Sequence, residues 1–413
     1  MSAKAADYHK RLEEFMVEEV FPAEKSYDEY RAAMGPGDFT VPPVVEELKT
    51  KAKQQGLWNL FLPSESGLTN LEYAPLAELS GWSTEIAPEA INCAAPDTGN
   101  MEVLHMFGTA EQKNYFLPRI LTGEVFFCQG YSEPESGSDL ASLSMAAVID
   151  ESAGDLICTG SKIWTTHAME ANWIFALVRT TRGERKQQGI TFVLIDMTSP
   201  GIEIRPLVMT SGEEIQTQIF FDAVRVPTTN VIGRIDDGWT VAKYLLEFER
   251  GGSAAAPSLQ VMAESIGREA RHQPGPGGGM LLDDPAFAAK LADVRIRTEV
   301  LEILEYRVLA AVAEGRNPGA SSSMLKILST ELSQAITELA MEAAGPRGRV
   351  YQPHATRPGG PIADYQPPAD GYVSGQPWQA VAPLRYFNDR AGSIYAGSNE
   401  IQRNILAKAT LGL

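Results

Sequence analysis

Residues 239–252, WTVAKYLLEFERGG, form a predicted helix that carries two carboxylates suited to general-base chemistry, Glu247 and Glu249. Side chains two positions apart on a helix point about 200° away from each other, so only one can face a given pocket. Arg250 lies three positions after Glu247, close enough for a surface ion pair. The pattern therefore offers one base here, with a solvated helix carboxylate as the ordinary alternative.

A second segment, residues 129–140, is rich in hydroxyl groups and has the sequence QGYSEPESGSDL. It begins at the end of a predicted strand and continues into a tight turn. Hydroxyls and backbone N–H groups in such a turn can bind the edge of a planar heterocycle or a phosphate. An ordinary polar turn has the same composition, so the segment by itself leaves both interpretations open.

Two further segments place aromatic and small residues at regular positions. Residues 160–166, GSKIWTT, put Trp164 and Thr166 on a predicted strand, where core packing is the common role of such residues. Residues 393–403 read SIYAGSNEIQR and open the last predicted helix. Position 396 of this segment is alanine, which cannot accept a proton.

Composition narrows the classes of protein to consider. The chain has 413 residues and a formal net charge of −18, which argues against a duplex-DNA binder. Its three cysteines and five histidines are scattered, so neither a disulfide framework nor a metal cluster is expected. No apolar run approaches the ~20 residues needed to cross a bilayer, and the N-terminus lacks an apolar leader. A cytoplasmic protein is expected.

The periodicity of apolar residues divides the chain into three zones. Residues 1–122 are helical, residues 123–233 contain short β-branched and aromatic runs, and residues 234–413 are helical again. Within the last zone, residues 274–279 are all proline or glycine and are not expected to form a helix. Residues 345–383 are predicted to form a second loop of unknown role, rich in proline and glycine.

Three of these segments resemble signatures of the acyl-CoA dehydrogenase family. EPESGSD is similar to EPxxGSD, GSKIWTT to GxKxWIT, and IYAGSNEIQR to IYEGTxxIQR. The resemblance covers essentially the whole chain and implies an α+β fold: an N-terminal helical domain, a middle β-barrel domain and a C-terminal four-helix bundle. The closest likeness is to large subunits of bacterial pimeloyl-CoA-type and steroid-side-chain enzymes.

The resemblance also assigns roles to individual residues. Residues matched to FAD contacts of the family are Gln129, Tyr131, Ser132, Gly137, Trp164, Thr166, Gly397, Ser398 and Glu400. Residues matched to acyl-CoA contacts are Ser138, Glu247, Arg250 and Tyr395. The family's usual Arg-x-x-Phe-Gly segment, whose Arg reaches the FAD pyrophosphate of a neighbouring subunit, has no counterpart here; Arg268 and Arg271 are the available substitutes.

The catalytic base differs from that of most members. They carry it as the Glu of IYEGT, and the matching residue here is Ala396. A minority branch, which includes isovaleryl-CoA dehydrogenase, carries the base on the earlier helix before a Glu-Arg pair. Glu249-Arg250 stands at that location, so Glu249 is assigned as the base.

The implied reaction is FAD-dependent α,β-dehydrogenation of an acyl-CoA to the trans-2-enoyl-CoA, with electrons passed to an electron-transfer flavoprotein. The enzyme is expected to be a homotetramer or a heterotetramer. One alternative is a catalytically silent flavin-binding subunit without a working base. Another is a flavin oxidase or monooxygenase on the same fold, of which an acyl-CoA oxidase would usually carry a further C-terminal domain. The identity of the acyl group does not follow from the sequence.

Overall fold

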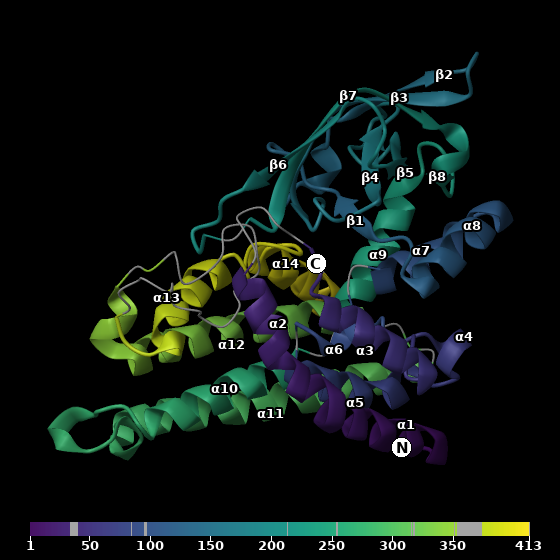
Figure 1. The fold of residues 1–413 in the computed structure, drawn as a ribbon. Coiled ribbons are helices and arrows are strands. Elements are labelled where there is room, and N and C mark those ends of the chain that lie inside the picture. The colour runs from purple at the N-terminus through teal and green to yellow at the C-terminus, as the bar shows by residue number, and fades with distance from the viewer. Residues whose placement is uncertain are drawn as a thin grey trace. The chain divides into compact units, whose positions relative to one another are not determined.

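The computed structural model describes two compact units, drawn together in Figure 1. Described residues are 1–33, 40–83, 85–94, 97–212, 214–252, 255–314, 316, 319–350, 352 and 374–412. For residues 32, 97–98, 247–252, 312 and 377 the structure describes the helical backbone but not the side chains. Unit 1 comprises residues 1–93, 210–212 and 250–413, and unit 2 comprises residues 94–209 and 213–249.

The N-terminal part of unit 1 is built from helices. They are α1 (Ala3–Phe15), α2 (Phe21–Ala33), α3 (Pro43–Gln54), α4 (Pro63–Ser66), α5 (Asn70–Ser80) and α6 (Ala87–Ala90), with a π-turn over Met16–Val20 between the first two. Leu12, Phe15 and Leu76 are buried and belong to one apolar core, which holds these helices together. A capping box at Thr69 starts α5, since the Thr69 side chain and Glu72 satisfy each other's backbone N–H groups.

Longer helices form the C-terminal part of unit 1. They are α10 (Ala256–Ala270), α11 (Pro285–Ala313), α12 (Ala320–Ala344), α13 (Pro377–Asp389) and α14 (Asn399–Leu411). Helices α10, α11 and α12 share an apolar core that includes Phe287, Leu332 and Ile336, each almost wholly buried. Helix α12 also packs against α13 and α14, which positions the loop between them.

Unit 2 contains the sheet. Its helices are α7 (Asp97–Phe107), α8 (Ala110–Thr122) and the start of α9 (Gly238–Gly252). The strands are β1 (Phe127–Gly130), β2 (Ala146–Asp150), β3 (Asp155–Thr166), β4 (Trp173–Arg179), β5 (Ile190–Asp196), β6 (Ile202–Leu207), β7 (Gln216–Pro227) and β8 (Val231–Ile232). They form one mixed sheet in the order β6-β7-β3-β2-β4-β5-β8, with β1 paired to β4. Strands β4 and β5 are buried almost throughout, as expected for central strands.

The predicted α+β fold, with helical regions flanking a β-region, is confirmed. Residues 274–279 form no regular helix, as expected: Pro276–Gly278 is only a short turn, in which Gly277 adopts a non-helical φ of +76°. Another local prediction was wrong in part. Within the predicted loop 345–383, Gly345–Arg349 is a 3-10 turn and α13 begins at Pro377, because proline suits the first turn of a helix. Residues 351 and 353–373 of that loop lie outside the described residues.

No helix in the described ranges is long and apolar enough to span a membrane.

Candidate functional site

A buried ion pair anchors the hydroxyl-rich segment to strand β3. Lys162 Nζ lies 2.8 Å from Glu133 Oε1, and the two side chains are 0% and 5% exposed. The Glu133 carboxylate also accepts hydrogen bonds from the backbone N–H groups of Ser144 and Met145, at 2.6 and 2.9 Å. A buried ion pair is tolerated only when its remaining hydrogen-bonding groups also have partners. These two N–H donors supply such partners for the Glu133 carboxylate.

Electrostatics keeps the Glu133 carboxylate ionised. Burial by itself raises the pKa of Glu133, but the charge and hydrogen bond of Lys162, together with the two backbone N–H groups, lower the pKa below its usual value. The Lys162 ammonium also donates to the carbonyl oxygen of Tyr131 at 3.3 Å. One ammonium group therefore holds the start of the 129–140 segment at two points.

The alternation of buried and exposed side chains along strand β3 is interrupted at Trp164. Leu156, Cys158 and Lys162 are buried, so strict alternation would bury residue 164 as well. Instead the pairing with β7 shifts register between Ile163 and Thr165, and Trp164 adopts φ +65°. This β-bulge turns the indole outward, leaving it 56% exposed. A left-handed backbone at a bulky residue is costly and is concentrated at functional sites.

Beyond the bulge the two threonines face opposite ways. Thr165 is 1% exposed, and among the described residues its hydroxyl has no hydrogen-bond partner. Its carbonyl oxygen accepts a hydrogen bond from the Thr217 hydroxyl at 3.0 Å, which fixes the backbone on the β7 side. Thr166 is exposed beside Trp164. The bulge thus presents an indole and a hydroxyl on the outer face of the sheet.

The predicted residues of the 129–140 segment lie next to this bulge in the chain fold. Ile163 N–H donates to the carbonyl oxygen of Ser132 at 2.9 Å, one residue before Trp164. Tyr131 is buried, and its ring meets Phe192 edge-on, with centroids 6.0 Å apart. Gln129 is half-buried on β1, whereas Gly137 and Ser138 are exposed in the turn. The structure therefore brings the predicted segments 129–140 and 160–166 together within unit 2.

A single guanidinium ties the residues that directly follow this segment to another loop. Arg179, at the end of β4, donates to the carbonyl oxygens of Ala141 at 2.8 Å and Leu143 at 3.1 Å. It also donates to the carbonyl oxygens of Lys186 at 3.0 Å and Gln188 at 2.7 Å, in the β4–β5 loop. The stretch that follows the hydroxyl-rich turn and the β4–β5 loop thus share one buried side chain.

The C-terminal segment, in unit 1, has a different construction. Ala396 and Gly397 are consecutive left-handed residues, with φ +52° and +79°. The side-chain amide of Gln402 donates to both of their carbonyl oxygens, at 3.0 and 3.2 Å. Asn399 N–H donates to the carbonyl oxygen of Ser393 at 2.9 Å, which closes the loop. These hydrogen bonds hold residues 393–399 in a sharp turn, and the buried Lys326 Nζ donates to Asn399 Oδ1 at 2.8 Å from another part of unit 1.

The predicted residues of this turn lie at the start of α14. The Ser398 hydroxyl caps the helix by accepting the N–H of Ile401 at 3.4 Å. Glu400 is exposed in the first helical turn, where its own backbone N–H and the Ser398 hydroxyl lower the pKa of its carboxyl group. Tyr395 and Ala396 are exposed. The turn thus offers helix N–H groups beside an exposed methyl at position 396.

The predicted base and its neighbours lie in the last turns of α9. The backbone of Glu247, Glu249 and Arg250 is helical, but their side chains lie outside the described residues. Earlier on α9, the Tyr244 ring meets Phe107 of α7 edge-on, with centroids 5.3 Å apart. The assignment of Glu249 as base stays a prediction.

A surface pocket opens at the start of α9, away from these residues. Its lining is polar and of mixed charge, and none of the predicted site residues belongs to it. The lining residues are Arg185, Gln187, Gln188, Asp236, Asp237, Trp239, Thr240 and Lys243.

Sequence reasoning gave no role to three residues that build the candidate site: Glu133, Lys162 and Gln402. Lys162 could have been found from the sequence, because it lies an even number of positions after Leu156 and Cys158. On a strand it therefore shares their buried face. A buried lysine demands a carboxylate partner. No comparable pattern marked Gln402, whose role depends on the turn that it closes.

Family models match nearly the whole chain. The acyl-CoA dehydrogenase N-terminal domain matches residues 3–124, the middle domain residues 128–224 and the C-terminal domain residues 236–411. The chain belongs to the acyl-CoA dehydrogenase family. That family consists of oxidoreductases that act on acyl-CoA, as the sequence predicted.

Individual relatives agree with this assignment. Over 248 residues the chain is 47% identical to FadE2 of Mycobacterium tuberculosis, covering 59% of this chain and 61% of FadE2. It is 33% identical to IpdE1, an acyl-CoA dehydrogenase of the same organism, covering 87% of this chain and 85% of IpdE1. A solved structure of an acyl-CoA dehydrogenase-like protein from Mycobacterium abscessus superposes with a TM-score of 0.81 at 27% identity, covering 100% of this chain and 98% of that chain.

Proposed function

We propose that the protein is an FAD-dependent acyl-CoA dehydrogenase that forms trans-2-enoyl-CoA and passes electrons to an electron-transfer flavoprotein. The observation that carries this proposal is the β3 bulge. An exposed indole on a left-handed backbone, beside a buried threonine hydroxyl without a partner among the described residues, suits a planar cofactor with polar edges. FAD, when bound, supplies hydride acceptance.

The residues around the bulge fit FAD by their chemistry. Trp164 offers an aromatic face for stacking, and Thr166 offers an exposed hydroxyl for the ring edge. The Glu133–Lys162 pair holds both segments in place, so that little reorganisation is needed on binding. The N-terminus of α14, with Ser398 as its cap, is suited to a phosphate of the cofactor.

Glu249 is proposed to remove the α-proton of the thioester. Three features favour it: a carboxylate is required, the position used by most members holds Ala396, and α9 carries Glu249 in its last turn. Ala396 removes a competing charge from the exposed turn, since two carboxylates at one substrate would raise each other's pKa. Arg250, Glu247, Ser138 and Tyr395 are proposed to contact the acyl-CoA.

The deciding experiment is anaerobic flavin reduction by a panel of straight, branched, dicarboxylic and steroid-side-chain acyl-CoA esters. Purified protein is expected to be yellow, and a suitable ester should bleach the flavin. Glu249→Gln should keep the flavin while slowing the bleaching about 10²–10⁴-fold, the usual contribution of a general base. Glu264→Gln, an exposed carboxylate on α10, is the matched control and should bleach at the parent rate.

The other candidate functions give different results in the same experiment. A flavin that no ester bleaches indicates the silent subunit. Bleaching followed by rapid reoxidation in air, with peroxide formed, indicates an oxidase rather than a dehydrogenase. Equal bleaching rates for Glu249→Gln and the parent would remove Glu249 from the mechanism.

Self-association is proposed as well, from an apolar stripe on α11. Ile296, Val300 and Ile303 recur at helical spacing and are 61%, 52% and 61% exposed. Exposed aliphatic residues in one stripe favour burial against another chain. Ile303→Asp should lower the mass measured by light scattering. An unchanged mass would place the oligomer contact elsewhere, and a tetramer of the chain alone would argue against an obligatory second subunit.

A further inference from the structure

Helix α10 begins without a cap of its own. Its N-cap residue is Ala255, which has no side-chain acceptor for the first N–H groups of the helix. The missing acceptor comes from α11, about fifty positions later in the chain. Glu305 accepts the N–H of Ala255 at 2.8 Å and the N–H of Ala256 at 3.4 Å, through its two carboxylate oxygens.

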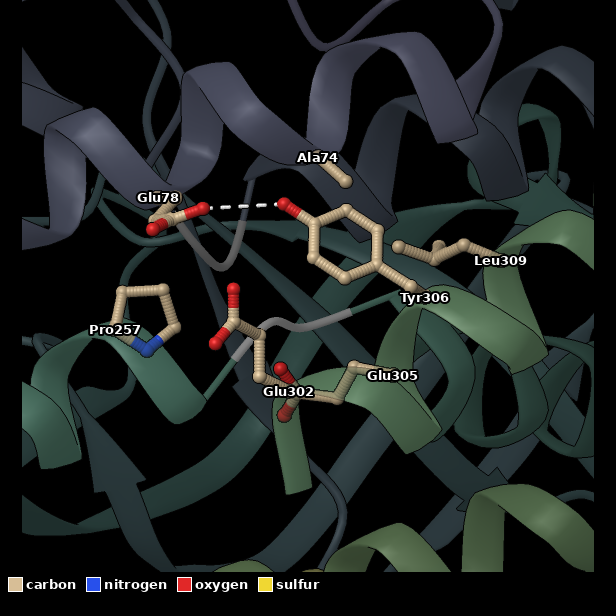
Figure 2. A pocket seen from close by; sticks show the side chains of 7 residues that line it. All are labelled: Ala74, Glu78, Pro257, Glu302, Glu305, Tyr306 and Leu309. Atoms are coloured by element: carbon tan, nitrogen blue, oxygen red, sulfur yellow. Dashed lines mark hydrogen bonds between the residues drawn. The ribbon is translucent and has the colours of Figure 1, made fainter. Parts of the chain in front are cut away.

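Glu305 lies in an acidic pocket that α5, α10 and α11 enclose (Figure 2). The Tyr306 hydroxyl donates to Glu78 at 3.1 Å, and Gln260 donates from α10 to Glu302 at 2.9 Å. The titratable groups that face Glu305 are therefore Glu78, Glu302 and Tyr306. Lining residues of the pocket are Ala74, Glu78, Pro257, Glu302, Glu305, Tyr306 and Leu309, and none of these is a cation.

This environment disfavours a negative charge on Glu305. Only 5% of the residue is exposed. Burial raises its pKa to about 7, although the two backbone N–H groups oppose the rise, and the neighbouring Glu302 adds to it. A carboxyl group that changes charge near neutral pH thus holds the first turn of α10.

The anchored turn stands close in sequence to the proposed base. Helix α9 ends at Gly252, three positions before Ala255, and Glu249 stands six positions before Ala255. A chain of so few residues spans at most roughly 20 Å, and less where it is helical. Fixing the N–H groups of Ala255 and Ala256 therefore restricts where the last turn of α9 can lie.

We propose that Glu305 is a positioning residue for catalysis: its carboxylate fixes the start of α10 and thereby the end of α9, which carries Glu249. This inference rests on the proposed function. The charged form binds both N–H groups with its two equivalent oxygens. The protonated form keeps one good acceptor and holds the turn less firmly. A small displacement of a base is enough to slow proton removal markedly.

The test compares Glu305→Gln with the parent, using single-turnover anaerobic flavin reduction from about pH 5.5 to about 9. The side-chain amide of this variant stays neutral at every pH, so the rate above pH ~7.5 should fall roughly 10-fold, and the rise in rate near neutrality should disappear. Affinity for acyl-CoA should change less than about 2-fold. Glu299→Gln, an exposed carboxylate on the same helix, should match the parent. A parent-like rate and pH profile in Glu305→Gln would overturn the proposal.

Hydrogen exchange measured by mass spectrometry provides a readout that needs no flavin chemistry. The amides of Ala255 and Ala256 should exchange roughly 10-fold faster in Glu305→Gln than in the parent at the same alkaline pH. Unchanged exchange rates would show that Glu305 does not hold the N–H groups of Ala255 and Ala256. If the parent bleaches with no ester, the proposed function fails, and the positioning role fails with it, whereas the exchange result still decides the anchor.

A second variant covers the case in which Glu305→Gln does not fold. Glu305→Asp keeps the charge but shortens the reach by one methylene. It should retain a pH-dependent rate while lowering the maximal rate, since the contact to Ala255 lengthens. A pH-independent rate in this variant would contradict the role of the Glu305 charge.

Discussion

The two candidate cofactor-binding segments are held in place by different kinds of interaction. In unit 2 the 129–140 segment depends on a buried ion pair between residues 29 positions apart, Glu133 and Lys162. In unit 1 the backbone of the 393–399 turn is closed by neutral hydrogen bonds from Gln402 and Asn399, both within six positions of their acceptors. The lysine that reaches this turn, Lys326, donates to the neutral side-chain amide of Asn399 at 2.8 Å rather than to a carboxylate of the turn. A charged, long-range anchor fixes position firmly but fails completely when one partner is lost. A local network of amides should lose one bond at a time.

Breaking the ion pair should have the largest effect. Lys162→Met leaves Glu133 buried without its partner and should lower the unfolding free energy by about 3–5 kcal/mol. The variant should also lose its bound flavin. Urea denaturation and flavin content measure both losses. Lys186→Met is the control, because its pair with Asp139 is exposed and should contribute less than about 1 kcal/mol. If Lys162→Met is as stable as that control, the anchor is not electrostatic.

The next largest effect is expected when the catalytic carboxylate is moved from position 249 to position 396. In a Glu249→Gln background, Ala396→Glu should restore the bleaching rate by roughly 10-fold, since it returns a base to the turn used by most members. Ala396→Gln in the same background is the control and should restore nothing. No recovery with glutamate would mean that the 393–399 turn does not face the reacting carbon.

Removing the outward indole should affect binding rather than folding. Trp164→Ala should weaken FAD binding by about 3- to 10-fold through loss of stacking. Its unfolding free energy should change little, because the side chain is 56% exposed and its backbone is left-handed. Trp82→Ala, at an exposed tryptophan of unit 1, should leave FAD affinity unchanged. A large loss of stability in Trp164→Ala would assign the indole to packing.

The smallest effect is expected at the left-handed alanine. Ala396→Gly should stabilise the protein by about 0–1 kcal/mol, because relief of backbone strain is offset by the greater freedom of glycine in the unfolded chain. Ala409→Gly, in an exposed position of α14, should instead cost up to about 1 kcal/mol. Denaturant titration of both variants decides the sign. Equal losses in the two variants would show that Ala396 carries no strain.

The sequence predicted the fold class because periodicity and local strings point the same way over long stretches. Runs such as β4 and β5 alternate or stay apolar over whole strands, and the C-terminal helices repeat their apolar face for several turns. Prediction was weaker where one residue changes the backbone. Pro377 reads as part of a Pro/Gly loop, yet it starts a helix, since proline is favourable at a first turn and unfavourable later.

The candidate site was predicted in part for the same reason. Trp164 and Thr166 were named from their string, but the bulge that turns the indole outward depends on the pairing of β3 with β7, which no single-strand pattern contains. Glu305 was not predicted, because its role depends on where α11 passes the start of α10. The role of such a residue depends on a tertiary contact between two segments, and neither segment's sequence pattern indicates that contact.

Arg179 links two loops that have separate sequences but one shared guanidinium. Its hydrogen bonds reach residues 141 and 143 on one side and residues 186 and 188 on the other. If either loop lifts away, its own carbonyl oxygens and the guanidinium nitrogens bonded to them lose their partners, so we expect the opening of the two loops to be coupled. Insertions in the β4–β5 loop would therefore shift the stretch directly after the hydroxyl-rich turn, although no residue of that stretch had changed.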